Sequence, residues 1–383
     1  MSNNFCPIPW IGMFYIVDSA GVCCVDSVTT KTSPQNFKNT EHVKQLKKEF
    51  LAGVKPKSCN SCWQAEDAGM QSIRKHLTTR FIDYMDISQF DEDTDIGVKH
   101  LEIRASNLCN FKCRMCNSNN SIEIDREVNQ NPILQRHFKT TSHIDNEISD
   151  SDWEEIKQIS MGLESLILTG GEPLLIKKYY DLMDHLIENK KIQDILLMIY
   201  TNCSVYNPKF VEKMLKFKRV GLNLSIDAVG KVAEYQRHGT IWPVVKENIF
   251  KFIELPTVFA TIHSTITAYT ILDFSNLADL YLEIFNVSDK VNFKAHTINR
   301  SSPLAIKSLI GSHRDRALEQ IELSLNKLQD SKFKAIRVEL KSIQKQLISN
   351  VSDNSKFVEF TQALDTVRNE SFNTTFNINL TDQ

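Results

Sequence analysis

Short apolar runs alternate with longer stretches in which apolar residues recur every three or four positions through the middle of this 383-residue chain. The runs have the length of buried strands, and the stretches have the spacing of helices with one apolar face. Regular alternation of the two predicts a parallel sheet. The predicted strands are residues 98–105, 164–169, 194–201, 220–227, 258–267 and 291–297.

Helices are predicted between these strands. They are expected near 121–138, after a capping box at 151–154, and over about 177–189, 209–217, 242–254 and 273–285. Six such units suit an α/β fold, a partial (β/α)6 barrel of the TIM type over residues 98–300. Parallel barrels carry their chemistry at the carboxyl ends of the strands, so residues that follow the strands are the first site candidates.

The flanking segments follow other patterns. Residues 1–82 predict a small cysteine-rich module, with a β-hairpin whose strands are 14–17 and 22–25, then a helix over about 42–51. Residues 83–97 are acidic and predict a linker. Residues 301–383 predict a helical extension, with two helices packed on the barrel and a last helix near 356–368. A coiled-coil dimerisation arm is the alternative for the helical pair.

Composition narrows the function classes. No stretch of 18 apolar residues occurs, so no membrane span is expected. The net charge of −2 creates no general attraction to nucleic acid or to a membrane surface. Eight of the nine cysteines lie in tight clusters, which in a reducing compartment favours metal ligation over disulfides. A cytoplasmic protein is therefore expected.

Cys109, Cys113 and Cys116 follow a C-x3-C-x2-C spacing after the first predicted strand. Three thiolates in so short a loop can face one metal centre, and thiolates are the usual ligands of iron–sulfur clusters. On a 4Fe–4S cluster three ligands leave one iron open. Zinc is the alternative, but structural zinc takes four ligands, and no fourth cysteine or histidine lies close by in sequence.

This stretch resembles the signature of the radical S-adenosylmethionine (SAM) superfamily, with Met115 where an aromatic residue is commoner. The resemblance covers about residues 98–300. It implies that SAM binds the open iron, and that an electron from a donor such as flavodoxin or ferredoxin splits SAM into methionine and a 5′-deoxyadenosyl radical. That radical would abstract a hydrogen atom from the substrate.

Motifs at later strand ends strengthen the resemblance. The Gly-Gly-Glu-Pro sequence after the second strand matches the superfamily motif that contacts the SAM amino group, and later positions match those that contact the rest of SAM. The residues so implied are Gly170, Gly171, Glu172, Asn202, Ser225, Asp227 and Arg237. A helix cap is the alternative role for Ser225 and Asp227, and a surface position for Arg237. His263 and His296 suit the core as well as catalysis.

A second cysteine group lies near the N-terminus. Adjacent strand residues point to opposite faces, so only one of Cys23 and Cys24 can share a metal with Cys6, Cys59 and Cys62. Cys24 is the preferred candidate. Four thiolates suit zinc or a 4Fe–4S cluster. The arrangement resembles the Twitch (SPASM-like) modules of radical SAM enzymes, which implies a second, auxiliary 4Fe–4S cluster.

No pattern in the sequence identifies the substrate. The resemblance allows three roles for the auxiliary cluster: it accepts an electron from the substrate radical, binds the substrate, or only holds the module together. An electron-accepting cluster would make the net reaction an oxidation or a crosslink, and a peptide or protein is the preferred substrate. One alternative is a radical SAM tailoring enzyme or dehydrogenase that acts on a sugar or nucleotide-type small molecule. The other is a non-catalytic iron–sulfur or zinc scaffold that binds a partner.

Overall fold

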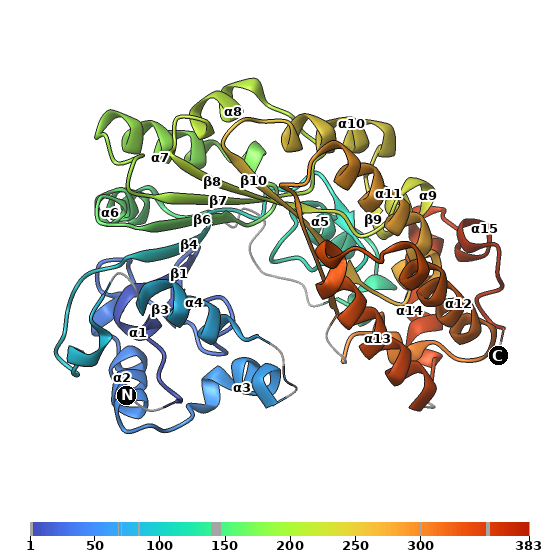
Figure 1. Cartoon of the computed structure of the whole chain (residues 1–383), viewed down its shortest axis with the longest axis horizontal. Coiled ribbons are helices and arrows are strands. Elements are labelled where there is room, and N and C mark those ends of the chain that lie inside the picture. The colour runs from blue at the N-terminus through green and yellow to red at the C-terminus, as the bar shows by residue number, and fades with distance from the viewer. Residues whose placement is uncertain are drawn as a thin grey trace. The chain divides into compact units, whose positions relative to one another are not determined.

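A computed structural model describes residues 3–67, 69, 71–82, 85–138, 147–298, 301–349 and 353–382 (Figure 1). Nine strands hydrogen-bond into one sheet in the order β11-β10-β8-β7-β6-β4-β1-β2-β3. Their bounds are β1 Gly12–Ile16, β2 Ser19–Gly21, β3 Thr30–Lys31, β4 His100–Arg104, β6 Ser165–Thr169, β7 Leu196–Thr201, β8 Arg219–Ser225, β10 Val258–Ile266 and β11 Asn292–Thr297. The order has two ends, so among the described residues the sheet is open and does not close into a ring.

All six strands predicted from the alternating pattern are present. They are β4, β6, β7, β8, β10 and β11, and each lies within its predicted range or one residue beyond it. β4 runs parallel to β6, and β10 runs parallel to β11. The predicted α/β class with a parallel sheet is confirmed.

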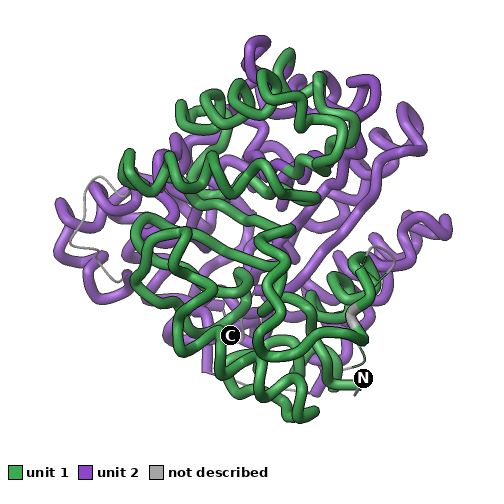
Figure 2. Tube along the Cα trace, turned by 90° about the vertical axis from the view of Figure 1, so that its left-hand side faces the viewer, with its two compact units in different colours: residues 1–106, 146–198, 212–220 green, residues 107–145, 199–211, 221–383 purple. Residues whose placement is uncertain are grey.

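The residues divide into two compact units, coloured separately in Figure 2. Unit 1 comprises residues 1–106, 146–198 and 212–220, and unit 2 comprises residues 107–145, 199–211 and 221–383. β7 and β8 each begin in unit 1 and end in unit 2. The boundary between the units therefore cuts through β7 and β8, and each unit is made of three separate segments of the chain.

The N-terminal hairpin turns earlier than predicted. β1 pairs antiparallel with β2, with Phe14 opposite Gly21, and the turn falls at Val17 and Asp18. The strand predicted over residues 22–25 is wrong, because the small residues 19–21 already form the returning strand. Cys23 and Cys24 lie in the turn that follows β2, so the strand rule that separated them does not apply. β1 also pairs in parallel with β4.

Short helices surround the strands of unit 1. They are α1 Ile8–Ile11, α2 Glu41–Leu51, α3 Asn60–Asp67, α4 Ile73–Ile82, α6 Asp150–Ser160 and α7 Lys177–Glu188. The α6 N-cap is Ser149, whose hydroxyl accepts a hydrogen bond from the Asp152 amide, two residues before the predicted box. The acidic segment is held by Lys47, whose ammonium donates to the carbonyls of Glu92 and Thr94.

Unit 2 contains most of the remaining helices. They are α5 Ile122–Gln130, α9 Gly230–Gln236, α10 Trp242–Ile253, α11 Phe274–Val287, α12 Gly311–Lys327, α13 Lys334–Ser349, α14 Ser355–Arg368 and α15 Phe372–Phe376, while α8 Pro208–Met214 crosses the unit boundary. α12 and α13 contact each other, and α12 contacts α11 while α13 contacts β11. A two-stranded antiparallel ribbon, β5 Lys112–Cys113 with β9 Arg237–His238, was not predicted.

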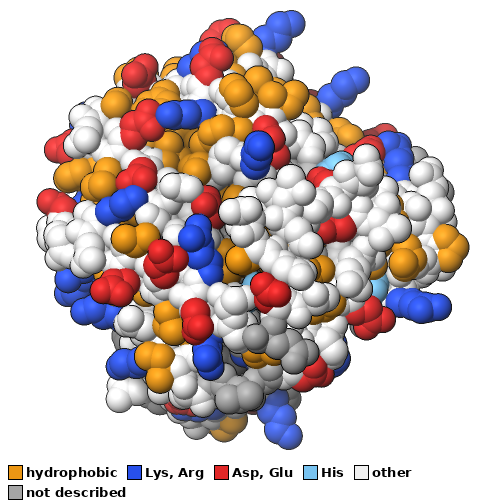
Figure 3. Space-filling view, turned by 90° about the vertical axis from the view of Figure 1, so that its right-hand side faces the viewer, with side chains coloured by type: hydrophobic (Ala, Val, Ile, Leu, Met, Phe, Trp, Pro, Cys, Tyr) orange, Lys and Arg blue, Asp and Glu red, His pale blue; other side chains and the backbone are white. Residues whose placement is uncertain are grey.

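The described part of the chain has no helix with the length and apolar character needed to cross a membrane. On the face shown in Figure 3, acidic and basic side chains of the described residues are interspersed. That face carries no broad patch of one charge, in keeping with the small net charge.

Candidate metal and cofactor site

The loop of Cys109, Cys113 and Cys116 is fixed by backbone pairing within unit 2. Cys113 lies in β5 opposite Arg237 of β9, and the Cys116 amide donates to the Cys113 carbonyl over 3.0 Å. The Ser121 hydroxyl closes the loop by donating to the Phe111 carbonyl over 2.7 Å. The loop is therefore held by strand pairing and a tight turn at its second and third cysteines.

Polar donors lie against two of the three sulfurs. Arg237 Nη1 is 3.9 Å from Cys113 Sγ, and Asn202 Nδ2 is 4.0 Å from Cys109 Sγ. Burial raises the pKa of the Cys113 thiol to about 12, while Arg237 acts to lower it. Cationic and N–H donors at a sulfur favour its thiolate form, which is the form that binds metal. These surroundings fit a thiolate-held iron–sulfur cluster.

Arg237 also forms a buried ion pair with Asp227. Its Nε lies 2.7 Å from Asp227 Oδ2, and the other carboxylate oxygen accepts from the Thr265 amide over 2.8 Å. Burial opposes the charge on Arg237, but Asp227 holds its pKa above the usual value. The pair was not predicted, because ten residues of chain including α9 separate its members.

The predicted SAM contacts of unit 2 surround one small hollow. Asn202, Ser225, Asp227 and Arg237 all line it. Ser225 ends β8, and Asp227 follows it, as expected for side chains at the carboxyl edge of a parallel sheet. The structure thus brings together four predicted residues from three separate parts of the sequence.

The predicted glycine turn follows β6 in unit 1. Gly170 has a φ of 115°, and a Cβ there would lie 2.7 Å from the Ser106 carbonyl oxygen. The Gly171 amide donates to the same carbonyl over 3.0 Å. Glu172 is fully buried, and its carboxylate accepts from the Leu174 amide. The turn is packed against the residue that precedes the cysteine loop in sequence.

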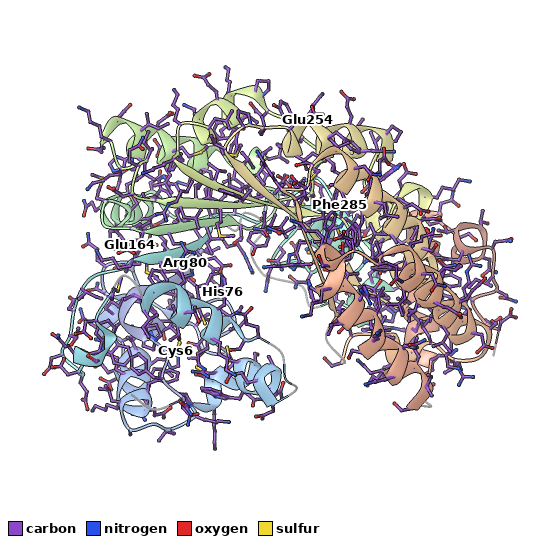
Figure 4. The ribbon with its side chains drawn as sticks, viewed as in Figure 1. Cys6, His76, Arg80, Glu164, Glu254 and Phe285 are labelled. Carbon is purple, nitrogen blue, oxygen red and sulfur yellow. The ribbon has the colours of Figure 1, made fainter. Side chains whose placement is uncertain are left out.

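Four N-terminal cysteines line one apolar pocket of unit 1, where Figure 4 labels Cys6. They are Cys6, Cys23, Cys59 and Cys62. Burial raises the pKa of Cys23 and of Cys59 to about 12. Cys24, the preferred fourth ligand, does not line this pocket. Burial and the neighbouring Glu102 carboxylate raise the pKa of its thiol instead.

The two histidines left open between core and catalysis lie together in unit 2. The rings of His263 and His296 are 4.8 Å apart, on adjacent strands β10 and β11. Burial lowers the pKa of His263 to about 4, with a further contribution from His296. Neither ring belongs to the buried core, since His263 is partly exposed and His296 is exposed.

No three His, Cys, Asp or Glu side chains among the described residues converge closely enough to hold a single metal ion. The case for both cysteine groups therefore rests on the shared pocket, the loop geometry and the donors described above.

Residues 103–280 match the model of the Radical SAM superfamily. The match includes the three loop cysteines, the glycine turn and all four residues of the hollow. Just under half of the chain is therefore similar to the radical SAM domain.

The uncharacterized protein MJ0907 of Methanocaldococcus jannaschii is 29% identical over 134 residues, covering 35% of this chain and 40% of that protein. Similar solved structures include native anSMEcpe with bound AdoMet and Cp18Cys peptide, at 18% identity, 58% of each chain and TM-score 0.39. Streptococcus suis SuiB bound to S-adenosylmethionine is matched at 15% identity, 69% of this chain, 62% of that chain and TM-score 0.36. The chain thus spans less than two thirds of each of these relatives.

Proposed function

We propose that this protein is a radical SAM enzyme that abstracts a hydrogen atom from its substrate. The observation that carries the proposal is the cysteine loop with Asn202 and Arg237 against its sulfurs, since the same two side chains line the hollow beside Ser225 and Asp227. When bound, the cluster and SAM supply the one-electron and radical chemistry, which side chains alone do not provide.

The chain's own residues hold and orient these groups. Cys109, Cys113 and Cys116 are the proposed cluster ligands. Gly170, Gly171 and Glu172 are the proposed contacts for the SAM amino group, where two glycines let backbone approach a ligand closely.

The four residues of the hollow have distinct proposed tasks. Ser225 and Asp227 would receive the ribose hydroxyls, and Arg237 the SAM carboxylate, for which a guanidinium is a good geometric match. The Asp227–Arg237 pair at 2.7 Å keeps both side chains aligned before SAM arrives. Asn202 is proposed to lie beside the cofactor, because its amide nitrogen already reaches Cys109.

The N-terminal pocket is proposed to hold an auxiliary 4Fe–4S cluster on Cys6, Cys23, Cys59 and Cys62. Cys23 replaces Cys24 in this proposal, because Cys23 lines the pocket and Cys24 is placed against Glu102. An electron acceptor in this position would make the net reaction an oxidation or a crosslink.

Peptides and proteins are the substrate class that we propose to test first, because enzymes with auxiliary-cluster modules that the sequence resembles act on them. A sugar or nucleotide-type small molecule is the second class to test. A flavodoxin or ferredoxin as electron donor and a cytoplasmic location belong to the same proposal.

The test is production of 5′-deoxyadenosine after dithionite reduction of anaerobically reconstituted protein with SAM. Cys113→Ala should abolish it, because two thiolates do not hold the cluster. Cys203→Ala is the matched control, since Cys203 is also buried but lies outside both cysteine groups. Equal production by Cys113→Ala and the unaltered protein would refute the proposal, and no production by the unaltered protein would favour the scaffold alternative.

A further inference from the structure

The C-terminal segment 365–370 contacts the cysteine loop, although it lies far outside the matched residues 103–280. Arg114, between Cys113 and Cys116, has a fully buried side chain. Its Nη2 lies 2.6 Å from Asp365 Oδ1 and 2.5 Å from Glu370 Oε2. A guanidinium inside the cysteine motif is therefore held by two carboxylates from the end of the chain.

The residue on the other side of Cys113 is held by the same segment through one intermediary. Lys112 Nζ lies 2.6 Å from Glu127 of α5, and Glu127 lies 2.6 Å from Arg368 Nη2. The Glu127 and Arg368 side chains are only 6% and 1% exposed. Both sequence neighbours of Cys113, Lys112 and Arg114, are thus connected to residues 365–370 by charged hydrogen bonds.

The strand that pairs with Cys113 has the same attachment. His238 Nδ1 of β9 lies 2.6 Å from Glu370 Oε1, and the Tyr235 hydroxyl donates to Asp365 over 2.8 Å. The Arg114 guanidinium lies 3.5 Å from the centre of the Tyr235 ring. Both strands of the β5–β9 ribbon are therefore connected to residues 365–370, β9 directly and β5 through Glu127.

The end of α14 brings Asp365, Arg368 and Glu370 close together. The helix stops at Arg368, Asn369 turns the chain with a φ of 52°, and the Glu370 amide then donates to the Asp365 carbonyl over 3.0 Å. This turn places Asp365 and Glu370 on the same guanidinium.

The charges in this network are balanced. Its cations are Arg114, Lys112 and Arg368, and its carboxylates are Asp365, Glu370 and Glu127, with His238 beside Glu370. Loss of one carboxylate leaves the network beside Cys113 with an excess positive charge. Low-dielectric surroundings make such a charge felt strongly at short range.

We propose that Asp365 and Glu370 are positioning residues for the SAM-binding cluster, which hold its ligand loop through Arg114 and balance the charge beside it. This inference rests on the proposed function of the cysteine loop. It assigns to the C-terminal segment a part in the cofactor site that lies in another region of the sequence.

Two isosteric or near-isosteric variants that change the local charge in opposite directions test this inference. Asp365→Asn removes one negative charge near the cluster and so makes its surroundings more positive, which stabilises the reduced cluster, and the midpoint potential should move to a more positive value. Arg114→Gln removes a positive charge, so the potential should move to a more negative value. Reductive titration of the reconstituted full chain, followed by electron paramagnetic resonance, measures both, with the auxiliary cluster signal as internal reference.

Glu359→Gln is the matched control, because Glu359 is an exposed carboxylate of the same helix α14. It should leave the potential unchanged. Iron content and circular dichroism, measured on each variant, separate loss of the fold from loss of the cluster. If the unaltered protein holds a normal cluster whose midpoint potential is unchanged in both charge variants, or shifts in the same direction in both, this inference is overturned and the proposed function stands. Absence of that cluster would overturn the proposed function and this inference with it.

Discussion

Substitution of Gly170 by alanine tests the geometry of the glycine turn directly. At a φ of 115° an alanine is strained, and its Cβ would lie 2.7 Å from the Ser106 carbonyl oxygen. Backbone strain of this kind costs about 1–3 kcal/mol. Forcing one extra carbon into a packed site costs about 1–3 kcal/mol more. The expected loss in the free energy of unfolding is therefore about 2–6 kcal/mol.

Gly97→Ala separates the two contributions. Gly97 has a φ of 71°, and a Cβ there would meet no atom within 4 Å. Its substitution carries only the backbone cost, about 1–2 kcal/mol. Urea denaturation of both variants measures the difference, and SAM affinity measured by calorimetry should fall only for Gly170→Ala. If the two variants lose the same free energy and bind SAM equally well, the close packing of the turn on Ser106 is not what makes glycine necessary.

Two further predictions concern unit 1. Burial, with Arg80 and His76 of α4 nearby (Figure 4), lowers the pKa of His100 to about 3. Below about pH 6.5 the unfolded chain binds a proton at His100 that the folded chain does not bind. Between pH 7 and pH 5 the free energy of unfolding of the unaltered protein should therefore fall by about 2 kcal/mol more than that of His100→Phe. Parallel pH profiles of the two proteins in urea denaturation would contradict this. Cys23→Ala should lose the iron of the auxiliary cluster, whereas Cys24→Ala should keep it. Iron and sulfide per chain measure both, and the reverse result would make Cys24 the ligand.

Local sequence patterns were enough to predict the strands and the cysteine loop. The strand predictions held because each apolar run is continuous along the chain, so its burial does not depend on which strand lies next to it. Cys109, Cys113 and Cys116 lie within eight residues, so their short spacing alone marks them as a group, although β5 is completed by pairing with the distant β9. The gathering of Asn202, Ser225 and Asp227 at one hollow followed from the rule that parallel strands end at one edge.

The hairpin near Cys23 shows where local patterns were insufficient. The sequence predicted the returning strand over residues 22–25, but Ser19–Gly21 form it. β1 also pairs with β4, whose residues lie 88 positions further along the chain. Because β2 ends at Gly21, Cys23 and Cys24 lie in the turn that follows it, where strand alternation does not decide which of them lines the pocket.

The sequence alone therefore determined the candidate metal ligands, because their spacing along the chain is short, and the candidate cofactor-binding positions, because parallel strands end at one edge. Only the tertiary structure decided which charges neutralise one another. Asp365 is 251 residues from Arg114, and no periodicity or motif relates them. The packing of the helices in the folded protein decides which charged residues so distant in sequence become partners. A buried cation is stable only where this packing places a carboxylate next to it.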